Sequence, residues 1–264
     1  MSVTVIPRKS YDDINAVNIS MLLEGVDNMA KLKYAKDNPK EKTPEMTFGI
    51  AYHIAVFEQG DFDKRVIQCP YADYKKQEAR DWRDEQELNG LIPLKADAMQ
   101  QIRDMKEALL KHPDVAEILS TPGKSEAALE WTDPDTGMLC KGRLDRLSQY
   151  KGYTWIWDLK TCQSAALKEF QRSVINDNYH CRADWYLSGC NALHEADRRF
   201  AWIAQEKTPP HSVAIYEPDD SFLAAGKRIW KRLLKEYKEA CETKDFKGYP
   251  FGIETLEMPA WGNK

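Results

Sequence analysis

Three neighbouring segments in the middle of the chain constrain the fold most, because apolar and polar residues alternate in them with the two-residue period of β-strands. In the first segment the apolar positions are Ala127, Leu129 and Trp131. The expected strands are 125–131, Met138–Asp145 and Tyr153–Lys160. The residues between the first two strands, Asp133–Gly137, are turn formers, so these strands are expected to form a hairpin.

Helical periodicity precedes and follows these strands. Residues 1–45 are expected to be largely helical, and Thr43 followed by Pro44 predicts the start of a strongly apolar helix. The expected helices are Met46–Glu58, Lys95–His112, Ala165–Ile175, Tyr179–Leu193 and Ser221–Glu242. Two more strands are expected at Arg199–Glu206 and Ser212–Tyr216. This order predicts an α/β fold with a central mixed sheet flanked by helices, built as a single domain over residues 1–264.

Composition excludes several classes of protein. The formal net charge is −4, so no overall basic field favours nucleic acid, although a groove can be locally basic. No apolar run is long enough to span a membrane, and the N-terminus lacks a secretory signal. We expect a cytoplasmic protein with no membrane partner.

The chemistry-bearing residues lie on the second and third strands. Asp158 and Lys160 are two positions apart and therefore project from the same face, while Trp157 and Leu159 point to the opposite face. Asp145 lies at the end of the preceding strand, and a short hairpin connection would bring it beside Asp158. Two carboxylates next to an ammonium group predict a site for a hard divalent cation.

Magnesium prefers oxygen ligands, and two carboxylates with a main-chain carbonyl suffice as protein anchors. A lysine beside such an ion can position or deprotonate a water, or balance negative charge on a phosphate, which is the chemistry of phosphodiester hydrolysis. The alternative is an ordinary strand whose charged face is solvated or ion-paired. The strongly apolar strand around Asp158 and the Gly142–Asp145 segment at hairpin distance favour the catalytic interpretation.

These residues resemble the PD-(D/E)xK nuclease superfamily, and in particular the RecE-type (exonuclease VIII) nuclease domains. The resemblance extends from about Asn18 to Trp261. The matching blocks are Gly49-x-Ala51-x-His53, Ser125–Ala127, Trp131–Pro134, Leu139-Cys140, Gly142–Arg146, Asp158–Thr161 and Leu256-x-x-Pro259-x-Trp261.

The resemblance implies that Asp145 and Asp158 bind the metal together with the Leu159 carbonyl, and that Lys160 acts on the nucleophilic water. It also implies that His53 is a metal ligand, although a lone histidine in an apolar helix is more often a core residue. The metal is expected to be Mg²⁺, with Mn²⁺ as a substitute. Glu126 is left outside the predicted catalytic set, because a glutamate on a surface strand has an equally simple explanation.

The segment Tyr179–Tyr186 resembles the helix that follows the lysine strand in this family. Tyr186 fits the family's Q-x-x-x-Y pattern, but Arg182 stands where glutamine is expected. We expect Tyr179, Arg182 and Tyr186 to support the site or to contact DNA, with Arg182 altering substrate contacts. The alternative is a packing helix with an exposed arginine.

The resemblance further implies ATP-independent 5′→3′ digestion of linear double-stranded DNA, a homo-oligomeric ring and a RecT-like single-strand annealing partner. Three alternatives remain: an endonuclease or single-strand-specific nuclease with the same metal site, a catalytically weak DNA-binding scaffold, and a soluble enzyme of unrelated chemistry.

Overall fold

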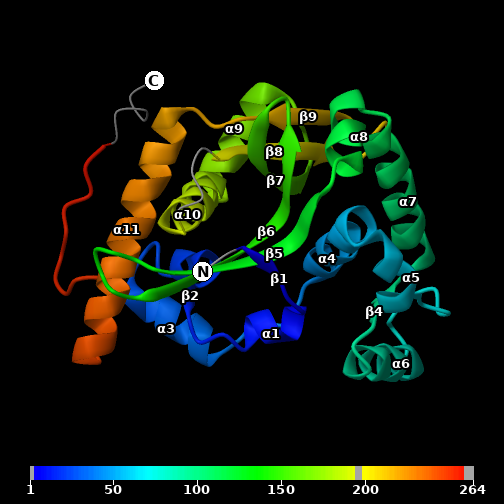
Figure 1. The fold of residues 1–264 in the computed structure, drawn as a ribbon. Coiled ribbons are helices and arrows are strands. Elements are labelled where there is room, and N and C mark those ends of the chain that lie inside the picture. The colour runs from blue at the N-terminus through cyan, green and yellow to red at the C-terminus, as the bar shows by residue number, and fades with distance from the viewer. Residues whose placement is uncertain (1–2, 194–197, 259–264) are drawn as a thin grey trace.

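The computed structural model describes residues 3–193 and 198–258, and its centre is a seven-stranded mixed sheet in the order β1-β5-β6-β7-β8-β9, with β2 beside β6 (Figure 1). Strands β5, β6 and β7 form an antiparallel meander, β8 is parallel to β7, and β9 is antiparallel to β8. The strands are β1 (Thr4–Val5), β2 (Val17–Asn18), β5 (Gly123–Thr132), β6 (Leu139–Tyr150), β7 (Tyr153–Cys162), β8 (Arg198–Glu206) and β9 (Val213–Tyr216). A separate pair, β3 (Val66–Gln68) and β4 (Ile92–Leu94), is parallel. The α/β fold with a central mixed sheet is therefore confirmed.

Helices cover both faces of the sheet. They are α1 (Arg8–Asp12), α2 (Ile19–Leu23), α3 (Met29–Asp37), α4 (Pro44–Phe57), α5 (Phe62–Arg65), α6 (Gln77–Leu88), α7 (Ala96–Leu110), α8 (Pro113–Ser120), α9 (Leu167–Asn176), α10 (Tyr179–Ala192) and α11 (Asp220–Thr243). One core cluster joins α2, α3, α9, α10 and α11 to one face of the sheet, and a second joins α4, α7 and α8 to the other.

Strands β7 and β8 contribute to both cores, because their side chains alternate between the two faces. On β7, Ile156 belongs to the first cluster, whereas Trp157 and Leu159 belong to the second. On β8, Trp202 faces the first cluster and Ile203 the second. The predicted orientation of Trp157 and Leu159, away from Asp158, is confirmed.

Helix α4 begins as its sequence predicts. The Thr43 hydroxyl accepts a hydrogen bond from the Met46 amide (3.3 Å), and Pro44 occupies the first turn, where its missing N–H is not needed. Phe48, Ala51 and Tyr52 are buried in the second core cluster. This anchoring fixes the position of His53, which is on the same helix.

The N-terminal region differs from the expected helical stretch. It contains the short strands β1 and β2 and three helices separated by turns. Asn18 and Asn28 accept hydrogen bonds from the amides of Met21 (2.9 Å) and Lys31 (3.0 Å) and so start α2 and α3 separately. These caps and the pairing of β2 with β6 divide the region into short elements, although its apolar residues recur at helical spacing.

Two further boundaries differ. Strand β6 continues to Tyr150, so Asp145 lies inside the strand and not at its end. Pro113 begins a helix of its own, α8, in addition to following α7. No helix in the described ranges has both the length and the apolar character needed to cross a membrane.

Candidate active site

The candidate site lies where the central sheet divides. Strands β6 and β7 pair from Tyr150 and Tyr153 as far as Arg146 and Trp157, and their ladder ends there. Beyond that point β6 continues beside β5 on one side and β2 on the other. We call the point where β6 and β7 stop pairing the fork. Asp145 immediately precedes Arg146, the last paired residue of β6, and Asp158 immediately follows Trp157, the last paired residue of β7. The hairpin therefore places Asp145 and Asp158 at the same level of the two strands, as predicted from the sequence, but Asp145 lies inside β6 and not at its end.

The fork leaves the main-chain groups of Leu159 without a strand partner on the β6 side, and two side chains of the site take that place. The Leu159 amide donates to Asp145 Oδ2 (2.9 Å). The Leu159 carbonyl lies 3.1 Å from His53 Nε2 and accepts a hydrogen bond if that nitrogen carries the proton. Such a tautomer leaves Nδ1 of His53 with a free lone pair.

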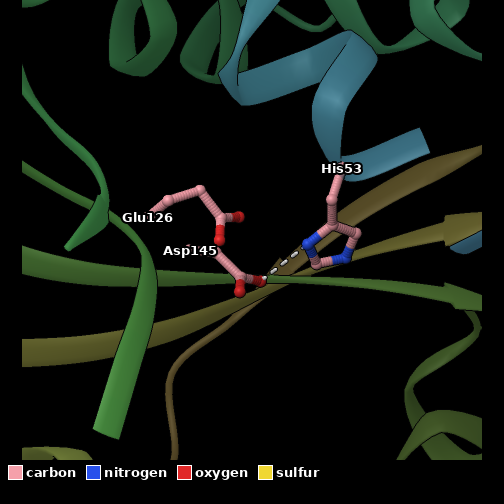
Figure 2. Close-up of side chains that lie close together, drawn as sticks. All are labelled: His53, Glu126 and Asp145. Atoms are coloured by element: carbon pink, nitrogen blue, oxygen red, sulfur yellow. Dashed lines mark ion pairs between the residues drawn. The ribbon is translucent and has the colours of Figure 1, made fainter. Parts of the chain in front are cut away.

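His53, Glu126 and Asp145 form a compact group. One potential ligand atom from each of these residues lies within 4.8 Å of the other two. Figure 2 shows the two carboxylates and the imidazole of α4 turned toward one another. His53 Nδ1 lies 3.5 Å from Asp145 Oδ2, and the two side chains are 25% and 17% exposed, so a small ion can reach them. Carboxylate oxygens with one imidazole nitrogen form a donor set that suits a divalent cation.

Glu126 is the residue of this group that sequence reasoning left out. The β5–β6 register pairs Ser125 with Arg146 and Ala127 with Leu144, which places Glu126 directly opposite Asp145. Burial, and then the charge of Asp145, raise the pKa of Glu126 to about 7, while Arg143 lowers it. The sequence did contain a signal for the position of Glu126. A hairpin centred on the turn at Asp133–Gly137 brings positions 126 and 145 together.

Asp158 and Lys160 form an ion pair inside the site, with side chains 6% and 19% exposed. Burial raises the pKa of Asp158, the Lys160 ammonium lowers it, and the neighbouring Asp145 raises it again. Lys160 Nζ also lies 5.2 Å from the ring centroid of Tyr179. The Lys160 ammonium is thus held at the site, beside the Asp158 carboxylate and the Tyr179 ring.

Helix α10 contributes the predicted supporting residues. Burial raises the pKa values of Tyr179 and Tyr186; negative charges add to both shifts, from Asp177 and then Asp158 for Tyr179 and from Asp158 for Tyr186. The Tyr186 ring also packs close to Gly142 of β6, since a Cβ built there would lie 3.1 Å from the ring. The Arg182 guanidinium donates to the Ser20 hydroxyl (2.6 Å) and so connects α10 to α2. Their roles in support or DNA contact remain predictions.

Comparison with known families decides the relationship. Residues 25–254 match the family described as PDDEXK-like domain of unknown function (DUF3799). The chain belongs to this family. The letters PDDEXK stand for a proline, two acidic positions and a lysine. The candidates for the acidic positions in this chain are Asp145 and Asp158, and the candidate for the lysine is Lys160.

The fold has a counterpart among solved structures. The crystal structure of a "putative exonuclease" from Eubacterium rectale is similar with a TM-score of 0.63 at 14% identity, covering 94% of this chain and 97% of that one. At this identity the likeness establishes a shared fold. The structure of SSO0001 is a weaker match, with a TM-score of 0.32 and 15% identity over 72% of this chain and 84% of that one, and it carries no argument. No curated protein sequence matches the chain.

One part of the predicted resemblance falls largely outside the described residues. Of the terminal block Leu256-x-x-Pro259-x-Trp261, Pro259 and Trp261 lie beyond residue 258. Leu256 is almost fully exposed, so the site is built without it.

Proposed function

We propose that this PDDEXK-like chain is a metal-dependent deoxyribonuclease that hydrolyses phosphodiester bonds. The observation that carries the proposal is the convergence, at one fork of the sheet, of a His–Glu–Asp group with the Asp158–Lys160 ion pair. Acidic ligands beside a positioned lysine supply the charges that phosphodiester hydrolysis requires. Family membership and the fold shared with the Eubacterium rectale protein support the same reaction class.

His53, Glu126 and Asp145 would form the centre of the ion site. Asp158 and the Leu159 carbonyl, which contact Lys160 and His53, are the further ligands that the resemblance implies. We propose Mg²⁺ as the physiological ion and expect Mn²⁺ to substitute, because the carboxylate and carbonyl oxygens of the donor set suit both ions. When bound, the cation would polarise the scissile phosphate and lower the pKa of a coordinated water.

The remaining steps belong to the chain's own residues. Lys160 is held between the Asp158 carboxylate and the Tyr179 ring, and in our proposal its ammonium orients the attacking water or balances negative charge developing on the phosphate. Leu159 and Asp145 keep the two strands in register through their main-chain to side-chain hydrogen bond. Arg182, which is partly exposed, is proposed to contact a DNA phosphate in place of the glutamine of RecE-type nucleases.

The finer form of the proposal follows the resemblance to RecE-type nucleases. In this form the chain digests linear double-stranded DNA from the 5′ end without ATP, leaving 3′ single strands for recombination. A homo-oligomeric ring enclosing the DNA and a RecT-like annealing partner belong to the same proposal. The net charge is −4, so DNA binding depends on locally basic groups, and we propose Lys160 and Arg182 as such groups at the site.

The decisive experiment uses linear duplex DNA labelled at the 5′ or the 3′ end, and a covalently closed circle of the same sequence. With Mg²⁺ we expect mononucleotide release from the 5′ label first, no cleavage of the circle, and no reaction with chelator. Asp145→Asn and Asp158→Asn should be inactive. Cleavage of the closed circle would replace the exonuclease by an endonuclease, and absence of all metal-dependent cleavage would contradict the proposal.

A further inference from the structure

Glu126 occupies an unusual backbone conformation. Its φ is 53°, in the left-handed region, although it lies within strand β5 and is not a glycine. This conformation costs about 1–2 kcal/mol for a residue with a Cβ atom. Such a residue persists where surrounding contacts determine its placement, and such positions concentrate at functional sites.

Two arginines of β6 contact Glu126 or the residue before it. Arg146 donates to the Ser125 hydroxyl (3.0 Å) and to the carbonyls of Leu119 (3.2 Å) and Thr121 (2.6 Å), so it ties the end of α8 to the residue before Glu126. Arg143 forms an ion pair with the carboxylate itself: its Nε lies 2.7 Å from Glu126 Oε2, although neither Nε nor Nη1 has a hydrogen-bond partner among the described residues. Both side chains of this pair are largely buried, at 11% and 14% exposed, so the pair is well shielded from water and salt.

Arg143 is also supported on its other side. Its guanidinium carbon lies 6.0 Å from the ring centroid of Tyr11, and the Lys141 ammonium lies 4.7 Å from the same ring. Lys141 in turn donates to the carbonyls of Tyr11 (2.9 Å) and Ile14 (2.8 Å), which holds the N-terminal segment against β6. The N-terminal segment is therefore held beside Arg143 and helps to fix its position.

The Glu126 carboxylate lies in a group of acidic side chains. One of its oxygens lies within 4.8 Å of potential ligand atoms of Asp145 and His53, and two carboxylates this close repel each other. Arg143 is the cation that forms an ion pair with Glu126.

We propose that Arg143 is a positioning residue, whose guanidinium holds the Glu126 carboxylate beside Asp145 and His53 and thereby sets the affinity of this group for a divalent cation. The inference rests on the proposed metal site and adds to it a residue that is not a ligand. Groups that orient metal ligands typically change metal affinity about 10- to 100-fold when they are removed.

The test is Mn²⁺ binding to the full chain by isothermal titration calorimetry. The variants are Arg143→Met, Arg143→Lys, Glu126→Gln and the double variant Arg143→Met with Glu126→Gln. We expect Arg143→Met to weaken binding about tenfold or more, and Arg143→Lys to restore part of the loss because it keeps the charge. In the Glu126→Gln background, Arg143→Met should add nothing, because its effect passes through Glu126. A general structural role for Arg143 would not give this non-additive result.

Arg172→Met is the matched control, since Arg172 forms an exposed pair with Glu169 on α9 (2.8 Å), and its Mn²⁺ affinity should equal that of the unmodified chain. Thermal melting in chelator checks that each variant is folded. If Arg143→Met does not fold, Arg143→Lys measured with and without Glu126→Gln gives the same comparison.

Wild-type affinity in Arg143→Met, or an equal loss in both backgrounds, would overturn the inference. Unchanged affinity in Glu126→Gln would overturn it as well, while leaving the nuclease proposal standing on Asp145, Asp158 and Lys160. Failure of the nuclease proposal appears separately, as absence of metal-dependent DNA cleavage.

Discussion

At the scale of single residues, the group proposed to bind the ion is distinct from the lysine proposed to act in the reaction. His53, Glu126 and Asp145 form the compact group, whereas Lys160 contacts Asp158 and Tyr179. A variant of the lysine should therefore affect the reaction more than the binding of the ion.

Lys160→Met should lower the cleavage rate by about 10²–10³, the usual cost of removing one group that stabilises charge in the transition state. Mn²⁺ affinity should stay within about tenfold of that of the unmodified chain, because Lys160 pairs with Asp158 and not with a residue of the His53, Glu126 and Asp145 group. Single-turnover cleavage and calorimetry measure the two effects, and the exposed Lys168→Met on α9 serves as control. Full cleavage activity in Lys160→Met would refute the assigned role.

The pKa of Glu126 predicts how stability depends on pH. Its folded-state pKa of about 7 exceeds the ordinary value of 4.5, so the folded protein keeps this proton to a higher pH than the unfolded chain does. The metal-free protein should therefore lose stability as pH rises from about 4.5 to about 7. Glu126→Gln removes this contribution, and its free energy of unfolding relative to the unmodified chain should increase between pH 5 and pH 8, by on the order of 2 kcal/mol.

Urea unfolding in chelator at several pH values measures this difference. Comparing the two proteins at each pH cancels the contributions of other buried acids, including Asp158 and Asp184, whose pKa values burial also raises. A difference that stays constant over this range would contradict the prediction.

At the scale of helices and strands, α10 carries the residues near Lys160 and depends on close contact with α11. A Cβ added at Gly226 of α11 would lie 2.6 Å from the carbonyl carbon of His180, at the start of α10. Main chain cannot move aside as a flexible side chain can, so α10 would have to shift.

Gly226→Ala should destabilise the protein by about 1–3 kcal/mol through this overpacking. Gly49→Ala is the matched control, because Gly49 also lies in a helix but has no atom within 4 Å of an added Cβ. That variant should gain about 0.5–1 kcal/mol, since alanine loses less backbone entropy than glycine in a helix. Thermal melting of both variants distinguishes the close contact from helix propensity; equal effects would exclude the contact.

Elements with local signals were predictable from the sequence, and elements set by distant contacts were not. The cap of α4 and the alternation in β5, β6 and β7 are encoded by neighbouring residues. The short strand β2 is defined by pairing with β6, and the path of α1 by the hydrogen bonds of Lys141, both across more than a hundred residues. The same holds for the site. The position of Asp145 beside Asp158 followed from the β6–β7 hairpin, whereas the position of Glu126 beside Asp145 depended on the register of the β5–β6 hairpin.

At the scale of the whole molecule, the two core clusters share the same central strands. Because β7 and β8 place alternate side chains in each cluster, loss of packing on one face removes support for the other. The prediction of a single domain over residues 1–264 therefore implies one cooperative transition.

Differential scanning calorimetry of the metal-free protein should give one peak, with calorimetric and van't Hoff enthalpies that agree. The exposed apolar side chains of the C-terminal segment offer an internal comparison. Phe251→Asp and Ile253→Asp should leave the melting temperature unchanged, because both side chains are fully exposed. Two separate calorimetric peaks would show that the two faces of the sheet unfold independently.

The division of the sheet at Asp145 has a consequence for how such a site can change over evolution. One proposed ligand, the oxygen of Leu159, belongs to the peptide backbone and is retained whatever amino acid occupies that position. Replacement of the side chain can disturb packing beneath the site but cannot delete the oxygen. Only a rerouting of β7, by an insertion or deletion near the fork, would remove it.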